Sequence, residues 1–255
     1  MRPNGQLEGG VSGSALTILL TVMFVNMIGF GIIVPLLPFY AQSFHAASWQ
    51  VALIFSGYSV GAFFGEPFWG RLSDRLGRKP VLMMTVCGNC ACYLGLAFAP
   101  NFAIALLIRI LGGLAAGNNS VLQSYLADVT HENDRAGRMA WANASYNVGF
   151  IIGPAVGGWL AAPALGTAGF RVPLLVAAAL SAICVAGLAL LVHESRNHAH
   201  EPLNPQLRRA VHELFRHPVI ARLLMVTFLS GAAFTGVESM FGLWAQGRFG
   251  WGPHE

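Results

Sequence analysis

Two charged residues, Arg109 and Glu238, lie inside runs of apolar residues that are long enough to cross a membrane. An arginine in the middle of a membrane helix costs about 2.5–3.5 kcal/mol on insertion scales, which about 20 apolar neighbours can outweigh. Charges kept at this cost usually face a polar cavity on the path of an ion or substrate. The alternatives are that Arg109 snorkels from near the outer end of its span, and that the last helix ends early and leaves Glu238 at the interface.

The segment 70–80 reads Gly-Arg-Leu-Ser-Asp-Arg-Leu-Gly-Arg-Lys-Pro and joins two apolar runs. Gly70 and Gly77 are expected to permit a tight turn and close backbone approach, because glycine has no Cβ to obstruct either. Asp74 is expected to pair with the neighbouring cations or to lie at a helix N-terminus, where the helix dipole favours an anion. An ordinary basic loop is the simpler interpretation, but such a loop needs neither the central acid nor glycines seven residues apart.

A glycine repeat marks a further apolar run. Gly149, Gly153 and Gly157 recur every four residues and so form one smooth helix face for close contact with another helix. Pro154 removes one backbone donor and is expected to bend that helix. Simple helix packing explains the same pattern.

The elements that position these residues are predicted to be membrane helices, because about 20 apolar residues span a bilayer as a helix. We read seven such runs, at residues 15–39, 50–69, 81–99, 102–126, 141–161, 173–193 and 219–244. The first is longer than the apolar part of a signal peptide, which is about 7–15 residues, so we expect it to be retained. The sequence therefore predicts an all-α polytopic membrane protein.

The Lys and Arg residues predict the orientation of these spans. Twelve of them lie before the first span, between the second and third, after the fourth, or around the gap before the seventh, whereas two, Arg171 and Arg248, lie on the opposite side. Because cytoplasmic loops are enriched in Lys and Arg, the N-terminus is predicted to be cytoplasmic. Seven spans then place the C-terminus outside.

The composition excludes several classes of protein. Apolar residues make up 55% of the 255 residues and charged residues only 10%, against about 25% charged in soluble domains. Disordered chains and coiled coils need more charge, and a net charge of +4 is too dilute for a nucleic-acid surface. The Cys87–Cys90 pair lacks the soluble context of a redox motif. No nucleophile–base pair, phosphate-binding loop or complete metal-ligand set is present, so we expect neither an enzyme nor a metal site.

Residues 194–218 are the one long hydrophilic stretch between spans and are predicted to be a cytoplasmic linker. Within it, Leu207, Val211, Leu214 and Phe215 recur at helical spacing with cations on the other face, which is typical of a helix lying on the membrane surface. Five histidines, at positions 193, 198, 200, 212 and 217, lie in or beside this stretch. A metal site there is the less favoured interpretation, since no cysteine or paired carboxylate completes a ligand set.

Three of these segments resemble motifs of the major facilitator superfamily. Residues 70–80 resemble its G-x-L-x-D-R-x-G-R-K signature, and residues 109–116 resemble its R-x-x-q-G-x-g-a-a stretch, with Gly112 and Ala115 replacing frequent residues. Residues 149–158 fit its antiporter signature G-x-x-x-G-P-x-x-G-G at every fixed position. The three motifs follow in order on successive helices, and the resemblance covers nearly the whole chain.

The resemblance implies roles for the candidate residues. It implies that Arg109 takes part in proton or substrate coupling and that a loop and an acid on the fourth span form a conformational gate. The gate residues are Gly70, Asp74, Arg75, Gly77, Arg78 and Asp128. The antiporter motif is expected to serve as a seal and hinge, through Gly149, Gly153, Pro154, Gly157 and Gly158. Tetracycline-type drug–proton antiporters, which residues 29–38 resemble, often carry an Asp where this chain has Asn26. An amide does not exchange protons, so if transport is proton-coupled, another acid is expected to serve, either Glu238 or one beyond the end of this chain.

The family's architecture implies four regions: a cytoplasmic segment (1–14), a six-helix N-terminal bundle (15–193), the linker (194–218), and the first helix of an incomplete C-terminal bundle (219–255). The predicted function is proton-coupled efflux of small amphiphilic compounds such as drugs by alternating access, with the chain apparently truncated. The expected partners are the lipid bilayer, a small-molecule substrate, and either a second half-carrier or the missing C-terminal bundle. The expected location is the inner or plasma membrane, with no cofactor beyond a proton gradient. The alternative is a truncated membrane protein that does not transport, or a partner of another carrier.

Overall fold

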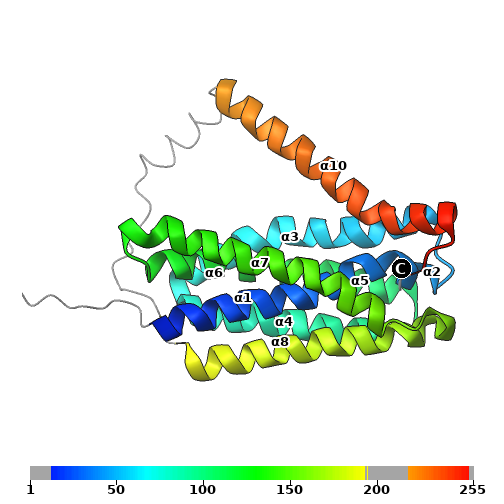
Figure 1. Cartoon of the computed structure of the whole chain (residues 1–255), viewed down its shortest axis with the longest axis horizontal. Helices are drawn as coiled ribbons and strands as arrows, with labels where there is room; N and C mark the ends of the chain where they lie inside the picture. The colour runs from blue at the N-terminus through cyan, green and yellow to red at the C-terminus, as the bar shows by residue number, and fades with distance from the viewer. Residues whose placement is uncertain (1–12, 193, 195–217, 253–255) are drawn as a thin grey trace, which may run out of the picture. The chain divides into compact units, whose positions relative to one another are not determined.

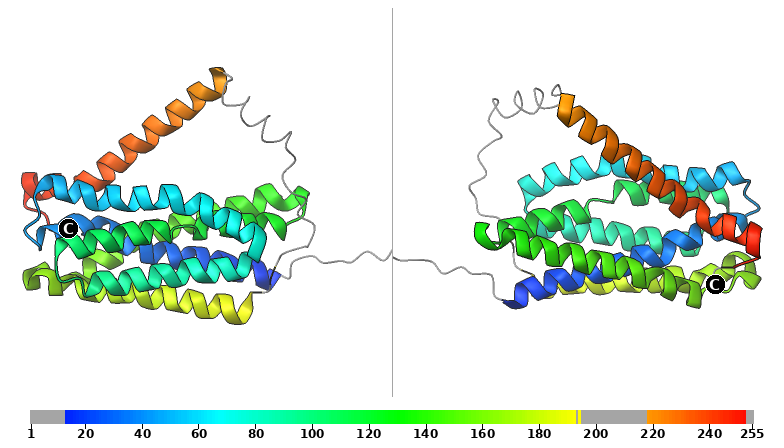
Figure 2. Two further views of the ribbon diagram at one scale, coloured as in Figure 1. Left: turned by 180° about the vertical axis from the view of Figure 1, so that it is seen from behind. Right: turned by 45° about the horizontal axis from the view of Figure 1, so that its top comes forward.

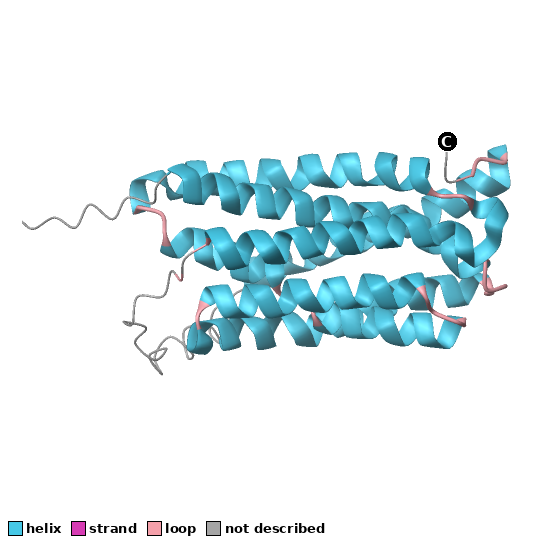
Figure 3. Ribbon diagram, turned by 90° about the horizontal axis from the view of Figure 1, so that it is seen from below, coloured by secondary structure: helices cyan, strands magenta, loops and turns pink. Residues whose placement is uncertain are grey.

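The computed structural model describes residues 13–192, Glu194 and 218–252, and every regular element in these ranges is helical (Figures 1 and 3). The all-α class predicted from the sequence is thus confirmed. The elements, with the 3₁₀ helices marked η, are α1 (Gly13–Ile33), η1 (Val34–Leu36), α2 (Leu37–Gln42), α3 (Ser48–Leu76), α4 (Arg78–Ala97), α5 (Phe102–Leu114), α6 (Asn118–Asp128), α7 (Glu132–Leu160), η2 (Pro163–Phe170), α8 (Arg171–Leu191) and α10 (Pro218–Phe249).

The chain divides into two compact units between Arg196 and Asn197, and each is described by itself. The larger unit holds α1 to α8, which run side by side as a bundle (Figure 2). The smaller unit holds α10, a single helix of 32 residues. The predicted surface helix at 206–216 and all five histidines of the linker lie outside the described residues.

Six stretches of the described chain are long and apolar enough to cross a membrane, namely Thr17–Gln42, Ser48–Leu76, Arg78–Ala97, Phe102–Asp128, Pro163–Leu191 and Pro218–Glu238. The predicted span at 141–161 is not among them, because it is rich in glycine and asparagine. Its residues 141–160 lie within α7, which has 29 residues and begins nine residues earlier than the predicted span. Helix α7 packs along α1, so its place in the bundle follows from packing rather than from hydropathy.

Two spans that the sequence predicts to be continuous are interrupted. The first changes from α1 to the short 3₁₀ turn η1 at Pro35, which cannot donate a backbone hydrogen bond, and then resumes as α2. The fourth stops at Leu114 and resumes at Asn118, so residues 115–117 break it into α5 and α6. Hydropathy does not reveal these breaks, because the interrupting residues are themselves mostly apolar.

The bundle has two hydrophobic cores, one toward each end. The first gathers residues of α1, η1, α2, α4 and α8 around Tyr40 and Phe170, whose rings meet edge to face. The second gathers residues around Val81, Leu122 and Leu188. We call the end of the bundle that holds the second core the Arg78 end, since Arg78 lies there at the start of α4. Packing at both ends fixes the helices, and the polar residues described next lie at the Arg78 end and between the cores.

Candidate functional site

A buried arginine joins three helix ends at the Arg78 end. The Arg78 side chain donates to Asp74 at 2.7 Å and to Ser73 Oγ at 2.6 Å, both in the last turns of α3. Its Nε donates to Asp128 at the end of α6 at 2.9 Å. Only 7% of Arg78 is exposed, so these charge-assisted bonds are partly shielded from water. The structure thus brings together Asp74, Arg78 and Asp128, three of the predicted gate residues.

Glu194, three residues after the end of α8, also joins the cluster and was not predicted from the sequence. Its carboxylate accepts hydrogen bonds from the backbone N–H of Arg78 at 2.8 Å and of Lys79 at 3.2 Å. These are the first two N–H groups of α4, which no helical carbonyl can satisfy, and an anion there is favoured by the helix dipole. Lys79 Nζ in turn donates to the carbonyl of Ala189 on α8 at 2.9 Å. An acid directly after the end of the predicted span at 173–193 was the available signal.

The two glycines of the 70–80 segment differ in their surroundings. Gly77 is the single residue between α3 and α4 and has a φ of +106°, in the region that favours glycine. A Cβ there would meet the carboxylate of Glu194. Gly70 instead lies inside α3 with no heavy atom within 4 Å of a Cβ at that position. The prediction that Gly70 makes a tight turn with close backbone approach is therefore wrong, because α3 continues as a helix through it.

The structure also places Asp74 and Arg75, the acid and the cation between those two glycines. Asp74 lies in the last turns of α3, not at a helix N-terminus, and of the two predicted alternatives it adopts the ion pair. Arg75 is exposed in the last turn of α3. The cluster therefore uses Arg78 alone as its buried cation.

The second buried arginine, Arg109, lies in the middle of α5 and is only 4% exposed. Its guanidinium carbon lies 4.4 Å from the centre of the Tyr58 ring, in cation–π geometry. Its Nε donates to the carbonyl of Ile54 at a long 3.5 Å. Within the described residues it has no carboxylate partner. The side chain thus lies between α3 and α5 inside the bundle rather than snorkelling to the end of its span.

Close helix contact positions Arg109. A Cβ on Gly113 of α5 would collide with the backbone of Tyr58 and Ala62, and one on Gly61 of α3 would collide with the backbone around Ile110. Small residues facing each other let two membrane helices approach closely. This contact places the Arg109 guanidinium over the Tyr58 ring.

The break after α5 lies beside this contact. Helix α5 ends at Leu114, whose carbonyl accepts a hydrogen bond from Trp69 Nε1 at 2.6 Å. Backbone groups freed by a broken helix inside a membrane must find other partners, and the indole of Trp69 supplies one. Trp69 also occupies the space in which Gly117 would place a Cβ.

Uncharged polar side chains meet just beyond the break. Asn118, the first residue of α6, donates from Nδ2 to Asn26 Oδ1 of α1 at 2.5 Å. Asn119 and Tyr146 of α7 line the same small cavity. Asn26 therefore lies among neutral groups, and the cavity that it lines contains no acid among the described residues.

The glycine repeat of α7 faces α1. A Cβ on Gly149 would meet the backbone of Phe24, one on Gly153 would meet Gly31, and one on Gly157 would meet Ile32. Gly158 is also buried, and Pro154 lies within the helix between these contacts. The structure thus brings the antiporter-like segment to α1.

Glu238 belongs to the other unit. It is partly exposed and lies in α10, which continues to Phe249, so the helix does not end at Glu238.

Comparison with known proteins identifies the relatives of this chain. The sequence model of the Major Facilitator Superfamily matches residues 19–254. The chain is 27% identical to "Multidrug resistance protein 2" of Bacillus subtilis over 249 residues, which cover 93% of this chain and 60% of the relative. It is 26% identical to "Quinolone resistance protein NorA" of Staphylococcus aureus, covering 91% of this chain and 59% of the relative. The chain thus spans about 60% of the length of these relatives.

Solved structures share the fold. A bacterial homologue of the human lysosomal transporter Spinster, in an inward-facing conformation, superposes with a TM-score of 0.77 at 19% identity, covering 98% of this chain and 58% of that one. The human organic anion transporter MFSD10 superposes with a TM-score of 0.71 at 23% identity, covering 94% and 66%. At these identities the similarity establishes the fold alone.

Proposed function

The chain belongs to the Major Facilitator Superfamily, and from this membership we propose that it supplies part of a carrier that exports small amphiphilic compounds, such as drugs, in exchange for protons. The named relatives support export, since one is a multidrug and the other a quinolone resistance protein. The Arg78 cluster, which ties four helices together at one end of the bundle, carries the proposal of alternating access.

The cluster suits a gate because its bonds share one cation. Asp74 and Asp128 belong to different helices and both bind Arg78, so withdrawing that side chain releases α3 from α6 in one step. Interfaces of this kind switch between discrete arrangements rather than deforming gradually. We propose that the gate faces the cytoplasm of a multi-pass plasma or inner membrane protein with a cytoplasmic N-terminus, as the distribution of Lys and Arg predicts.

Coupling is proposed to involve Arg109. A guanidinium held between a ring and a single long hydrogen bond is poorly compensated, so a change in nearby charge will affect its position strongly. Asn26 serves in this proposal as a neutral substrate contact, and Glu238 of α10 as a proton-binding acid. The glycine face of α7 against α1 is proposed to act as the seal and hinge.

The whole carrier in this proposal contains a second bundle, because family members move substrate between two bundles. That bundle comes either from a further part of the polypeptide or from a second half-carrier.

The deciding experiment measures export driven by a pH gradient in liposomes. We would compare the purified 255-residue chain with a version extended by about five spans, using a fluorescent amphiphile as substrate. The extended version is expected to export it, and Arg109→Ala is expected to abolish this export while leaving membrane insertion normal. Unchanged export by Arg109→Ala contradicts the coupling role. Absence of flux in both proteins favours a membrane protein that does not transport, or a partner of another carrier.

A further inference from the structure

Three of the four cysteines of the chain lie on α4, and their surroundings differ. Cys90 Sγ donates to the carbonyl of Ala178 on α8 at 3.3 Å. Cys92 faces α5 instead, because a Cβ on Gly112 would lie 3.6 Å from its Cβ and its Sγ. Cys87 is exposed on the surface of the bundle. Cys87 and Cys90 belong to none of the groups described above.

Cys87 and Cys90 are neighbours on one face of α4. Three residues of a helix advance about 4.5 Å along the axis and about 60° around it, so side chains at this spacing lie next to each other. Cys92, five residues after Cys87, lies about 140° around the helix from it and is not such a neighbour. Because Cys87 is exposed and Cys90 is held only through a weak S–H donor, both thiols can turn toward one atom between them.

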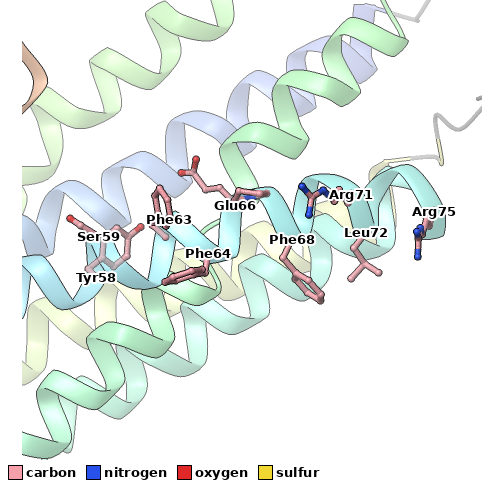
Figure 4. A pocket seen from close by; sticks show the side chains of 11 residues that line it. Tyr58, Ser59, Phe63, Phe64, Glu66, Phe68, Arg71, Leu72 and Arg75 are labelled. Atoms are coloured by element: carbon pink, nitrogen blue, oxygen red, sulfur yellow. The ribbon is translucent and has the colours of Figure 1, made fainter. Parts of the chain in front are cut away.

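The thiol pair lies on an apolar face. Met84 and Leu94, which lie beside Cys87 on α4, are 47% and 42% exposed. This helix is long and apolar enough to cross a membrane, so we expect its exposed face to meet lipid. The groove along α3 is a separate surface, since its described lining residues all lie between Tyr58 and Arg75 and none carries sulfur (Figure 4). A ligand of the thiol pair therefore reaches it through apolar surroundings.

Two thiols facing lipid select a ligand by its charge and by the number of bonds that it forms. An ion in hydrocarbon is costly, so a neutral product is favoured. Binding to a metal removes a proton from each thiol, so a soft monovalent cation such as Cu⁺ would leave a negative charge behind. Zn²⁺ would give a neutral product but takes three or four protein ligands. A trivalent arsenical with one organic substituent needs two thiols and gives a neutral product.

We propose that Cys87 and Cys90 form a covalent binding site for monosubstituted trivalent arsenicals, R–As=O, in which R is apolar. Both thiol protons pass to the oxygen, which leaves as water, and the arsenic–oxygen double bond is replaced by two As–S bonds. Arsenic remains trivalent, so the step needs no oxidant or reductant. The substituent R is expected to lie on the apolar face beside Leu94. This site does not depend on the proposed transport function.

Intact mass spectrometry of the reduced, purified chain after incubation with phenylarsine oxide tests the site. The chain is expected to gain one phenylarsenic group. N-ethylmaleimide labelling after denaturation, followed by peptide mapping, is expected to find Cys92 and Cys184 unreacted with arsenic. Cys87→Ser and Cys90→Ser are each expected to lower the affinity by about a hundredfold or more, because the second As–S bond forms within one chain.

The controls separate the thiol pair from the other cysteines and from folding. Cys92→Ser makes the same substitution on the other face of α4 and is expected to leave the affinity unchanged. Cys87→Ala adds no hydroxyl to the apolar face and is expected to lose as much affinity as Cys87→Ser. Unchanged affinity in Cys87→Ser overturns the proposal, as do equal losses in Cys92→Ser and Cys87→Ser. Because binding is measured without flux, absence of export leaves this site standing, and export without arsenical binding refutes only this site.

Discussion

Arg78 and Arg109 are almost equally buried, with 7% and 4% of their surfaces exposed, but their surroundings differ. Arg78 binds two carboxylates and a hydroxyl within 2.6–2.9 Å. Arg109 has one aromatic ring and one carbonyl at 3.5 Å. The bundle thus neutralises one buried cation fully and leaves the other with weak partners.

This difference predicts that replacing the two arginines has different consequences for stability. A buried ion pair repays its desolvation only when its geometry is good and all partners are present, as at Arg78. A cation without such partners contributes little to stability, so its retention inside a membrane calls for another reason. We therefore expect substitutions at Arg78 to act through folding and gating, and substitutions at Arg109 to act through transport alone.

The largest effect is expected for Arg78→Met. Removing the cation leaves Asp74 and Asp128 without their partner, but their side chains are 45% and 27% exposed and remain partly hydrated, so the loss is expected to be about 1.5–3 kcal/mol, the size of hydrogen bonds to charged groups. The free energy of unfolding in mixed detergent micelles measures this loss. Arg138→Met is the matched control, since its contact with Asp134 is a 3.9 Å surface pair worth about 0–1 kcal/mol. Equal losses in the two variants would show that the Arg78 cluster is no stronger than a surface contact.

Gly113→Ala tests the helix contact that positions Arg109, and we expect it to lower the free energy of unfolding by a smaller amount. The new Cβ would collide with the backbone of Tyr58, so α5 must move away from α3, at a cost of about 1–3 kcal/mol. Gly187→Ala on α8 has open space around its Cβ and is expected to be neutral or to stabilise by up to about 1 kcal/mol. The thermal unfolding midpoint is expected to fall in Gly113→Ala and to stay unchanged or rise in Gly187→Ala. A Gly113→Ala midpoint equal to that of wild type would mean that the helices are not in close contact.

Glu194→Gln is expected to have a still smaller effect. The amide keeps one acceptor for the first N–H groups of α4 but loses the charge that the helix dipole favours, so about 0.3–1 kcal/mol should be lost. Helix α4 is expected to show faster amide hydrogen exchange at Arg78 and Lys79 alone. Faster exchange throughout α4 would instead indicate that Glu194 holds the whole helix in place.

Much of the fold could be predicted from the sequence, and the reasons are physical. Spans are encoded in long apolar runs, and the Arg78-containing segment resembles a specific family motif. Most of the helices, and Asp74, Arg78 and Asp128 of the Arg78 cluster, were therefore identified without the structure. Which side chains pair across different helices cannot be predicted from apolar runs or from a motif. Glu194 lies 116 residues after Arg78, and only folding shows that its carboxylate accepts the Arg78 N–H.

The errors have the same origin. Gly70 was expected in a turn because glycine permits one, but α3 continues through this position as a helix. The break at residues 115–117 was missed because its residues are small and apolar, and the carbonyl of Leu114 just before it accepts a hydrogen bond from Trp69, 45 residues earlier in the chain.

The smallest change in stability is expected for Arg109→Met. Methionine has a similar length and no charge, so the variant removes a desolvated cation without leaving any carboxylate unpaired. Its free energy of unfolding is expected to lie within about 1 kcal/mol of wild type, whereas Arg78→Met is expected to lose about 1.5–3 kcal/mol. If export driven by a pH gradient is abolished in the same variant, the cation at position 109 is kept for transport. A loss of about 1.5 kcal/mol or more in Arg109→Met would mean instead that the Tyr58 ring and the Ile54 carbonyl stabilise this charge as well as two carboxylates stabilise Arg78, and the distinction between the two arginines would no longer hold.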